Sequence, residues 1–242
     1  MELHGVIQDR RHVFFVMDLM QSDLTAVLGR RSSMPSRPKL RRWMAQVALG
    51  IDALHNMGII HRDIKPENLL ISPDGKNVRI TDFTNSWIAP LRYAGTPFER
   101  TEPLLWYETY AEEKTGTREY LAPEIQVGHA YGPSVDWWSL GCVIFELLTK
   151  DTLFPDTEHL TAFIRHRNAY RPASEFLLHR AHYLLDSEVD LLSGLLHIHP
   201  ANRFRLEQLQ RHSWFKTPEY ACDSPCPLCA ELTQHVPQRQ YG

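Results

Sequence analysis

The most informative stretch of the chain reads, in order, His61, Arg62, Asp63, Ile64, Lys65, Pro66, Glu67 and Asn68. It places a carboxylate, an ammonium group and an amide within one short loop. An acidic and basic loop on an unrelated helical protein would account for Asp63 or Lys65 alone, but not for the whole run in this order. Farther along the chain, Asp82 precedes Phe83 and Thr84. The two segments together indicate a chemical site.

Residues 61–68 resemble the catalytic loop of eukaryotic-type serine/threonine protein kinases. In that family the aspartate of the loop, here Asp63, orients the attacking hydroxyl and accepts its proton, while Lys65 offsets charge on the transferred phosphoryl group. Asn68 and Asp82 would hold Mg²⁺, and ATP would donate the phosphate. The lysine resembles the serine/threonine branch, because tyrosine kinases usually differ there. The resemblance implies phosphate transfer to serine or threonine hydroxyls of protein substrates.

Residues 116–124 resemble the end of a kinase activation segment. The resemblance places Thr117 beside the catalytic loop, as part of the platform that receives the substrate. Glu124 would pair with Arg203 in the interior, in a structural role. Asp136 resembles the residue that holds the backbone of the catalytic loop, and a helix N-cap is the alternative interpretation.

The resemblance extends upstream into the segment that reads the nucleotide. Met17 falls at the gatekeeper position, and Asp18 and Met20 belong to the strip whose backbone binds adenine. Asp23 would lie near the ribose, and Leu70 beneath the adenine ring. The hinge resembles that of mitogen-activated kinases, whereas the end of the activation segment resembles basophilic kinases, so the subfamily stays open.

Three acidic residues bear on substrate choice and regulation. Glu67 and Glu146 resemble the acidic pocket in which basophilic kinases hold an arginine upstream of the acceptor, although both also occur where they serve only the fold. Glu113 stands where many related kinases carry a phosphorylated threonine that faces the arginine of the loop, here Arg62. We expect its single charge to replace that phosphate in part. A solvated acidic pair, or a true phosphorylation site at Thr115, is the alternative.

The spacing of apolar residues predicts a mainly helical α+β chain. Helices are expected over residues 40–57, 135–148, 158–167, 187–196 and 206–212, and hairpins over residues 3–19 and 69–80. Ser187 and Asp190 are expected to cap one of these helices. The implied protein-kinase-like fold has a small-lobe hairpin remnant with the hinge (1–20), a helical large lobe (21–215) and a polar, disordered tail (216–242). The long polar connection before Pro123 is expected to be regulatory.

Two features depart from the family pattern. Thr84 replaces the family glycine, and a β-branched residue resists backbone angles that glycine tolerates, so switching would be hindered. The 242 residues also hold neither a glycine-rich loop over the phosphates nor a strand lysine. We therefore expect this chain alone to bind ATP poorly. It is either part of a longer kinase or a half-kinase that acts as a protein-binding scaffold, and the retained catalytic loop favours the first.

Composition bounds the remaining classes of function. The formal net charge of −3 gives no overall attraction to nucleic acid or to an anionic membrane. No apolar run approaches the roughly 20 residues that span a bilayer. Four cysteines are too few to cross-link a chain of this length, which fits a reducing compartment, so we expect the cytosol or nucleus. We also expect a monomer. A zinc site is a further hypothesis, and its ligands would be Cys222, Cys226, Cys229 and His235. The spacing of these residues lacks the two Cys-x-x-Cys pairs that are typical of such sites.

Overall fold

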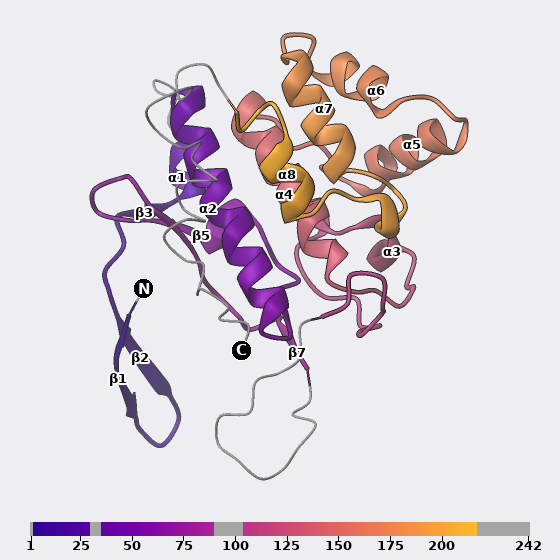
Figure 1. The fold of residues 1–242 in the computed structure, drawn as a ribbon. Helices are drawn as coiled ribbons and strands as arrows, with labels where there is room; N and C mark the ends of the chain where they lie inside the picture. Colours follow the sequence, from indigo (N-terminus) through magenta and orange to yellow (C-terminus); the bar gives the residue numbers. More distant parts are fainter. Residues whose placement is uncertain (1, 30–34, 90–103, 217–242) are drawn as a thin grey trace, which may run out of the picture.

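The computed structural model describes residues 2–29, 35–89 and 104–216. The helices in these ranges are α1 (Leu24–Gly29), α2 (Arg37–Asn56), α3 (Pro123–Gln126), α4 (Ser134–Thr149), α5 (Thr157–Asn168), α6 (Ala173–Arg180), α7 (Asp186–Leu195) and α8 (Leu206–Arg211). The strands are β1 (Leu3–Gln8), β2 (Val13–Met17), β3 (Ser22–Asp23), β4 (Ile59–Ile60), β5 (Leu69–Ile71), β6 (Val78–Ile80) and β7 (Trp87–Ile88). Figure 1 shows a helical body with small strands along one side, so the predicted α+β class is confirmed.

Helix α4 forms the centre of the helical body. Every residue from Ser134 to Phe145 is buried, as a sequence that is apolar on nearly all sides predicts. The helix contacts both α2 and α7. Gly141 allows the close approach to α7, because a Cβ at this position would lie 2.9 Å from the Cδ2 atom of Leu196. Trp138 stacks on Phe154 and completes this core, with ring centres 5.5 Å apart.

Helix α2 carries the predicted amphipathic pattern along one side of α4. The side chains that recur at helical spacing are all buried, namely Leu40, Met44, Val47, Ile51 and Leu54. Pro38 in the first turn suits a helix start, because its missing N–H would be unpaired there in any case. The chain leaves the helix through Gly58, whose φ of 77° favours glycine. The exit leads directly into β4 and the catalytic loop.

Two small antiparallel sheets frame that loop. Strands β3, β5 and β6 form one sheet, in which Asp23 lies opposite Leu70 and Leu69 lies opposite Ile80. Strand β4 pairs with β7 in the other. The predicted β5–β6 hairpin is therefore confirmed. Residues 61–68 emerge from β4 and enter β5, so both ends of the catalytic loop are held by strands.

The β1–β2 hairpin, also predicted, lies apart from the helical body at the lower left of Figure 1. Its apolar side chains are exposed on both faces, including Ile7 at 61% and Phe15 at 60%. The hairpin closes on itself at Asp18, whose backbone N–H donates to the carbonyl of Glu2 and whose carboxylate accepts from the Glu2 N–H. Its polar contacts are therefore local to the hairpin and the start of the hinge.

Three short helices, α1, α3 and α6, were not predicted, and one predicted cap is wrong. Helix α7 begins at Asp186, and the side chain of Glu188 accepts the backbone N–H of Leu185 at 2.9 Å. Glu188 thus caps the helix in place of Ser187, and Asp190 instead contacts His212. No helix in the described ranges is both long and apolar enough to span a membrane. The predicted tail (216–242), apart from Lys216, and the four residues of the zinc hypothesis lie outside the described residues.

Candidate active site

The backbone of the catalytic loop is held by one buried carboxylate. Asp136, in the first turn of α4, accepts the N–H groups of His61 at 2.9 Å and Arg62 at 2.8 Å. His55 Nε2 lies 2.8 Å from the same carboxylate. Burial raises the pKa of Asp136, but the hydrogen bonds and charges around it bring the net pKa below its usual value. The predicted anchoring role is confirmed by these contacts.

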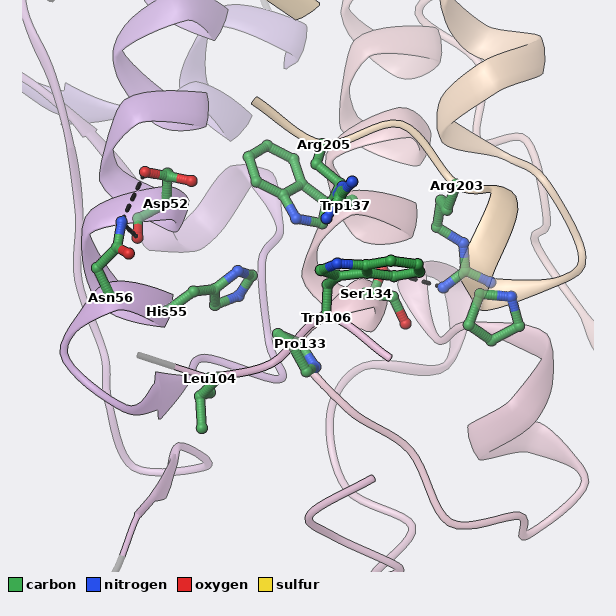
Figure 2. A pocket seen from close by; sticks show the side chains of 11 residues that line it. Asp52, His55, Asn56, Leu104, Trp106, Pro133, Ser134, Trp137, Arg203 and Arg205 are labelled. Carbon is green, nitrogen blue, oxygen red and sulfur yellow. Dashed lines mark hydrogen bonds between the residues drawn. The ribbon is translucent and has the colours of Figure 1, made fainter. Parts of the chain in front are cut away.

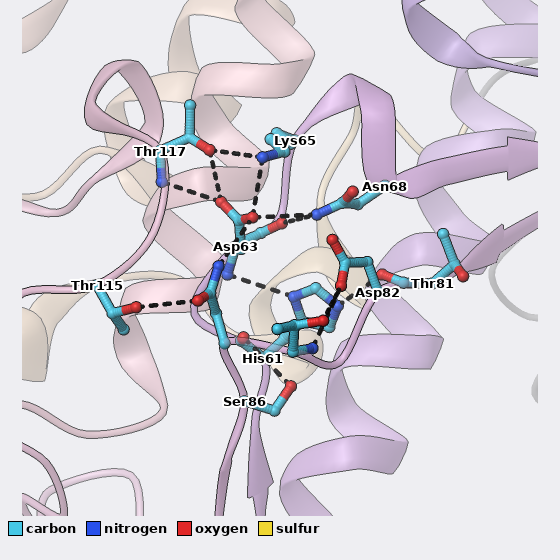
Figure 3. Close-up of polar contacts among 11 residues, drawn as sticks. His61, Asp63, Lys65, Asn68, Thr81, Asp82, Ser86, Thr115 and Thr117 are labelled. Atoms are coloured by element: carbon cyan, nitrogen blue, oxygen red, sulfur yellow. Dashed lines mark hydrogen bonds and ion pairs between the residues drawn. The ribbon is translucent and has the colours of Figure 1, made fainter. Parts of the chain in front are cut away.

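Asp63 lies at the centre of the polar cluster in Figure 3. Its Oδ1 accepts both the backbone N–H of Thr117 at 2.9 Å and the Thr117 hydroxyl at 2.7 Å. Its Oδ2 lies 2.9 Å from Nζ of Lys65, and the same Nζ donates to Thr117 Oγ1 at 2.7 Å. Burial raises the pKa of Asp63, but Lys65 and Thr117 outweigh that effect and lower it overall. The structure therefore brings together the three residues that the sequence assigned to the reacting end of the site.

Gly116 permits the contact between the activation segment and the loop. Its φ is 105°, a region that favours glycine. A Cβ at this position would collide with the backbone carbonyl oxygen of Arg62 and would also lie 2.8 Å from Leu121 Cδ2. The two chain segments can touch only because no side chain separates them, and this contact places Thr117 against Asp63.

Asn68 and Asp82 offer oxygen atoms on the same side of the loop. The amide nitrogen of Asn68 donates to the carbonyl and to Oδ2 of Asp63, at 2.9 and 3.2 Å. That orientation leaves the amide oxygen without a hydrogen bond among the described residues. Asp82 has a φ of 62°, and the hydroxyl of Thr84 donates to its Oδ1 at 2.6 Å. This hydrogen bond is the main cause of the lowered pKa of Asp82, which stays ionised.

One carboxylate and one amide oxygen fit Mg²⁺, which is usually held by one or two carboxylates together with substrate phosphates and water. Within the described ranges no group of three or more histidine, cysteine, aspartate or glutamate side chains is placed to hold a metal by itself. The sequence raised Thr84 as a hindrance, since glycine tolerates more backbone angles. The left-handed angle in this segment belongs to Asp82, and Thr84 instead contributes a hydroxyl donor.

The residues assigned to the nucleotide divide into two groups. Asp23 and Leu70 lie opposite each other on β3 and β5, and Asp23 also accepts the N–H of Ala26 at the start of α1. Met17 ends β2, where it is 44% exposed. Asp18 follows it, with its carboxylate bound to Glu2 and to His4. Met20, which lies between Asp18 and Asp23 in the sequence, is partly buried.

Asn85 is a site residue that sequence reasoning missed. Its amide nitrogen donates to Asp63 Oδ2 at 3.3 Å, and its amide oxygen accepts the hydroxyl of Thr115 at 3.2 Å. Its backbone carbonyl also accepts from the side chain of Arg62. The hydrogen bond from Asn85 is one cause of the lowered pKa of Asp63. The only available signal was its position shortly after Asp82, which gave no reason to choose an amide.

Arg62 and Glu113 form the contact that the sequence predicted. The guanidinium of Arg62 lies 3.1 Å from the carboxylate of Glu113 and also donates to the hydroxyl of Tyr131 at 3.1 Å. Arg62 is largely buried, whereas the side chain of Glu113 is 74% exposed. The predicted contact is confirmed. Thr115, the alternative phosphorylation site, instead bonds to Asn85 in this structure.

Glu146 and Glu67, the residues of the expected acidic substrate pocket, influence each other through their charges. The Tyr120 hydroxyl donates to Glu146 Oε2 at 2.6 Å. Burial is the main cause of the raised pKa of Glu146, and the charge of Glu67 raises it further. The two carboxylates are therefore close enough to repel each other. A cation placed between them would relieve that repulsion.

Glu124 and Arg203 serve the fold, as predicted. The guanidinium binds the carboxylate through two hydrogen bonds of 2.7 and 3.0 Å, and both side chains are buried. Arg203 also donates to the carbonyl of Ser134. The pair thus ties α3, just after the activation segment, to the start of α4 and to the chain before α8.

A hollow of about 120 Å³ lies beside this pair, between α2 and α4 (Figure 2). The Arg205 guanidinium sits 4.3 Å from the ring centre of Trp106, which belongs to the segment leading to Thr117. Leu104, at the start of that described segment, donates its backbone N–H to the carbonyl of His55. These contacts fasten the segment to the body. The hollow lies apart from Asp63 and holds none of the catalytic groups.

The comparisons with known proteins agree with this geometry. Residues 1–215 match the protein kinase domain, so the chain belongs to the protein kinase family. It is 38% identical over 154 residues to a cAMP-dependent protein kinase catalytic subunit of Arthrobotrys oligospora, covering 64% of this chain and 26% of that protein. It is 31% identical to the rice CBL-interacting protein kinase 20, covering 88% of this chain and 43% of that protein. Human ribosomal protein S6 kinase alpha-3 is 30% identical, with 89% and 27% covered. The chain thus spans less than half the length of these relatives.

Proposed function

We propose that this chain is the phosphate-transferring part of an ATP-dependent protein serine/threonine kinase. The observation that carries the proposal is the position of Asp63, which touches Lys65 and Thr117 at one edge of a loop whose backbone is fixed by Asp136. The relatives named above are themselves named as kinases. The substrates are protein serine and threonine hydroxyls, and the proposed compartment is the cytosol or nucleus.

In the proposed reaction, the acceptor hydroxyl approaches the carboxylate of Asp63. The oxygen of the acceptor hydroxyl forms a bond to the γ-phosphorus of ATP. At the same time the bond between that phosphorus and the β–γ bridging oxygen breaks, which releases ADP. The hydroxyl proton passes to Asp63 late in the transfer, because the lowered pKa of Asp63 makes it a weak base. Asp63 therefore acts chiefly by orienting the hydroxyl.

Lys65 and the proposed metal ligands would interact with the phosphates of ATP. Lys65 already contacts both Asp63 and Thr117, so its ammonium stands beside the position where the hydroxyl must lie. It would offset charge on the transferred group. Asn68 and Asp82 would hold Mg²⁺, which would supply positive charge to offset that of the nucleotide phosphates. Met17, Asp18, Met20, Asp23 and Leu70 form the proposed nucleotide side of the site.

Substrate choice follows from Glu67 and Glu146. Burial is the main cause of the raised pKa of Glu146, and the charge of Glu67 adds to it; a guanidinium placed between the two carboxylates would relieve that repulsion. We propose that the protein prefers arginine shortly before the acceptor, by about tenfold, since charge-assisted hydrogen bonds contribute roughly 1.5–3 kcal/mol. A positional-scanning peptide library measures this preference. A flat response to arginine would contradict it.

The proposed activity is tested with Asp63→Asn in the full-length protein. The substitution removes the orienting carboxylate with almost no change in volume, so phosphate transfer to a peptide library should fall at least about a hundredfold while the melting temperature holds. Asp186→Asn, an exposed aspartate in the first turn of α7, is the matched control. Turnover by Asp63→Asn close to that of the control would overturn the proposal.

A second candidate function is a protein-binding scaffold with impaired catalysis. The observation in its favour is the β1–β2 hairpin, whose apolar side chains are exposed on both faces. The same comparison decides between the two. If neither the unmodified protein nor the Asp186→Asn control transfers phosphate with ATP and Mg²⁺, the scaffold becomes the better proposal.

A further inference from the structure

A second hollow, of about 380 Å³, lies between the C-terminal end of α5 and the loop that joins α7 to α8. Its lining residues include Arg167, Asn168 and Tyr170 on the α5 side and His197, His199 and Asn202 on the loop side. None of them belongs to the catalytic loop or the activation segment. The proposed kinase reaction makes no use of this surface.

Arg167 is the charged group of the hollow. Its guanidinium donates through Nη1 to the carbonyl of Arg171, but its Nε–H is buried and has no hydrogen-bond partner. Among the described residues no carboxylate lies within ion-pair distance of Arg167. A buried donor without a partner is rare in folded proteins and usually indicates a missing water, ion or ligand.

The loop side adds further donors and no acid. Nδ1 of His197 lies 3.1 Å from the backbone nitrogen of His199 and 3.3 Å from its carbonyl oxygen, so this ring nitrogen is engaged by the backbone of the loop itself. Burial is the main cause of the lowered pKa of His197, and the positive charges of Arg167, His199 and Arg203 lower it further. Asn168 and Asn202 contribute amide groups. No carboxylate is among the residues that line the hollow.

The C-terminal end of α5 repels an anion less strongly than a helix end with unpaired carbonyl groups would. The N–H of Tyr170 donates to the carbonyl of Arg167 at 3.0 Å, and the N–H of Arg171 donates to the carbonyl of His166 at 3.3 Å. These two hydrogen bonds form the Schellman arrangement, which occupies carbonyls that would otherwise repel negative charge. The donors of the hollow therefore set its local charge.

Tyr170 gives an independent indication that this surface meets a partner. It occupies the position of that arrangement where glycine is usual, with a φ of 58°, and its side chain is 99% exposed. A left-handed tyrosine that packs against nothing gives no benefit to the isolated fold. Strained residues of this kind concentrate at functional sites, and tyrosine is enriched at protein interfaces.

We propose that this hollow binds a phosphate monoester on a phosphorylated side chain of a partner protein, with Arg167 as its charged anchor and Tyr170 at its rim. Arginine and neutral N–H donors match the oxygens of a phosphate. The volume falls in the range of sites for small molecules and exceeds what a free ion needs, so it fits a phosphorylated residue with its neighbours. A single arginine on a chain of net charge −3 does not favour nucleic acid.

The test measures binding of a fluorescein-labelled alanine-glycine peptide that carries one phosphoserine. Anisotropy titrations compare it with its unphosphorylated twin, and inorganic phosphate and a single-stranded oligonucleotide serve as competitors. We expect the phosphopeptide to bind at least about tenfold more tightly than its twin, as for charge-assisted contacts. Equal binding of the two peptides overturns the proposal. Competition by inorganic phosphate or the oligonucleotide at concentrations as low as for unlabelled phosphopeptide overturns the assignment to a partner protein.

Two variants locate the binding. Arg167→Gln should weaken phosphopeptide binding about tenfold, whereas Arg165→Gln, an exposed arginine in the same turn, should change it less than about twofold. Tyr170→Gly should raise the melting temperature, because glycine suits the left-handed position, yet should weaken binding. Equal effects of Arg167→Gln and Arg165→Gln, or full binding by Tyr170→Gly, would contradict the proposal. Phosphate transfer should be unchanged in all three variants, which separates this test from that of Asp63.

Discussion

The catalytic loop and the β1–β2 hairpin are both short non-helical segments, yet they are held in opposite ways. The loop is fixed from several directions: Asp136 binds its backbone, and Thr117 and Asn85 bind the carboxylate of Asp63. The hairpin bonds mainly to itself, and its side chains are exposed. The comparison teaches that the phosphate-transferring end is built into the core, whereas the segment carrying Met17 and Asp18 is only loosely tied to it.

The largest effect is expected from a substitution that breaks the buried ion pair between Glu124 and Arg203. Arg203→Ala leaves Glu124 buried and unpaired, so the free energy of unfolding should fall by about 3–5 kcal/mol. Arg211→Ala removes an exposed pair with Glu207 and should change it by less than about 0.5 kcal/mol. Urea denaturation measures both variants. Equal losses would mean that burial does not distinguish the two ion pairs.

The next effect tests how the carboxylate of Asp63 is tuned. Asn85→Ala removes a donor to Asp63, so kcat should fall about tenfold, which corresponds to one hydrogen bond. Because that donor lowers the pKa of Asp63, its loss should raise the pKa and move the acid limb of the pH–rate profile to higher pH. Asn56→Ala, an exposed amide on α2, is the control. An unshifted acid limb would remove Asn85 from the site.

A smaller effect concerns the contact between Arg62 and Glu113. Glu113→Ala should reduce phosphate transfer about two- to fivefold, since exposed ion pairs contribute little. Glu112→Ala, the exposed neighbour, should leave transfer unchanged. The assay is run after phosphatase treatment, so that only the carboxylate can supply the charge. Complete loss of activity in the unsubstituted, phosphatase-treated protein would contradict the partial replacement of a phosphate by Glu113.

The smallest effect is expected in the hairpin. Val6→Ala removes a side chain that is 55% exposed, so the free energy of unfolding should change by less than about 0.5 kcal/mol. Val143→Ala, at a fully buried position on α4, provides the contrast and should cost about 1 kcal/mol or more. A large loss for Val6→Ala would show that the hairpin is packed against another part of the protein in solution.

The sequence predicted the parts of this molecule that depend on local pattern or on ordered motifs. Helix α4 was found because it is apolar on all sides, and the Glu124–Arg203 pair because both residues stand within recognisable motifs. The predicted capping residues of α7 were wrong, because several acidic residues lie close together and their spacing alone does not distinguish Glu188 from Asp190. Asn85 was missed because its contact with Asp63 arises only when the chain folds back.

Gly116 makes the active site sensitive to substitution at a position that has no side chain. Because any side chain there would collide with the backbone at Arg62, a substitution would displace Thr117 from Asp63 without touching a catalytic atom. In genetic terms, a random screen for loss-of-function alleles should recover changes at this codon alongside those at Asp63. Alleles of the first kind would encode proteins with every reacting group intact, so an inventory of catalytic residues would misclassify them as active.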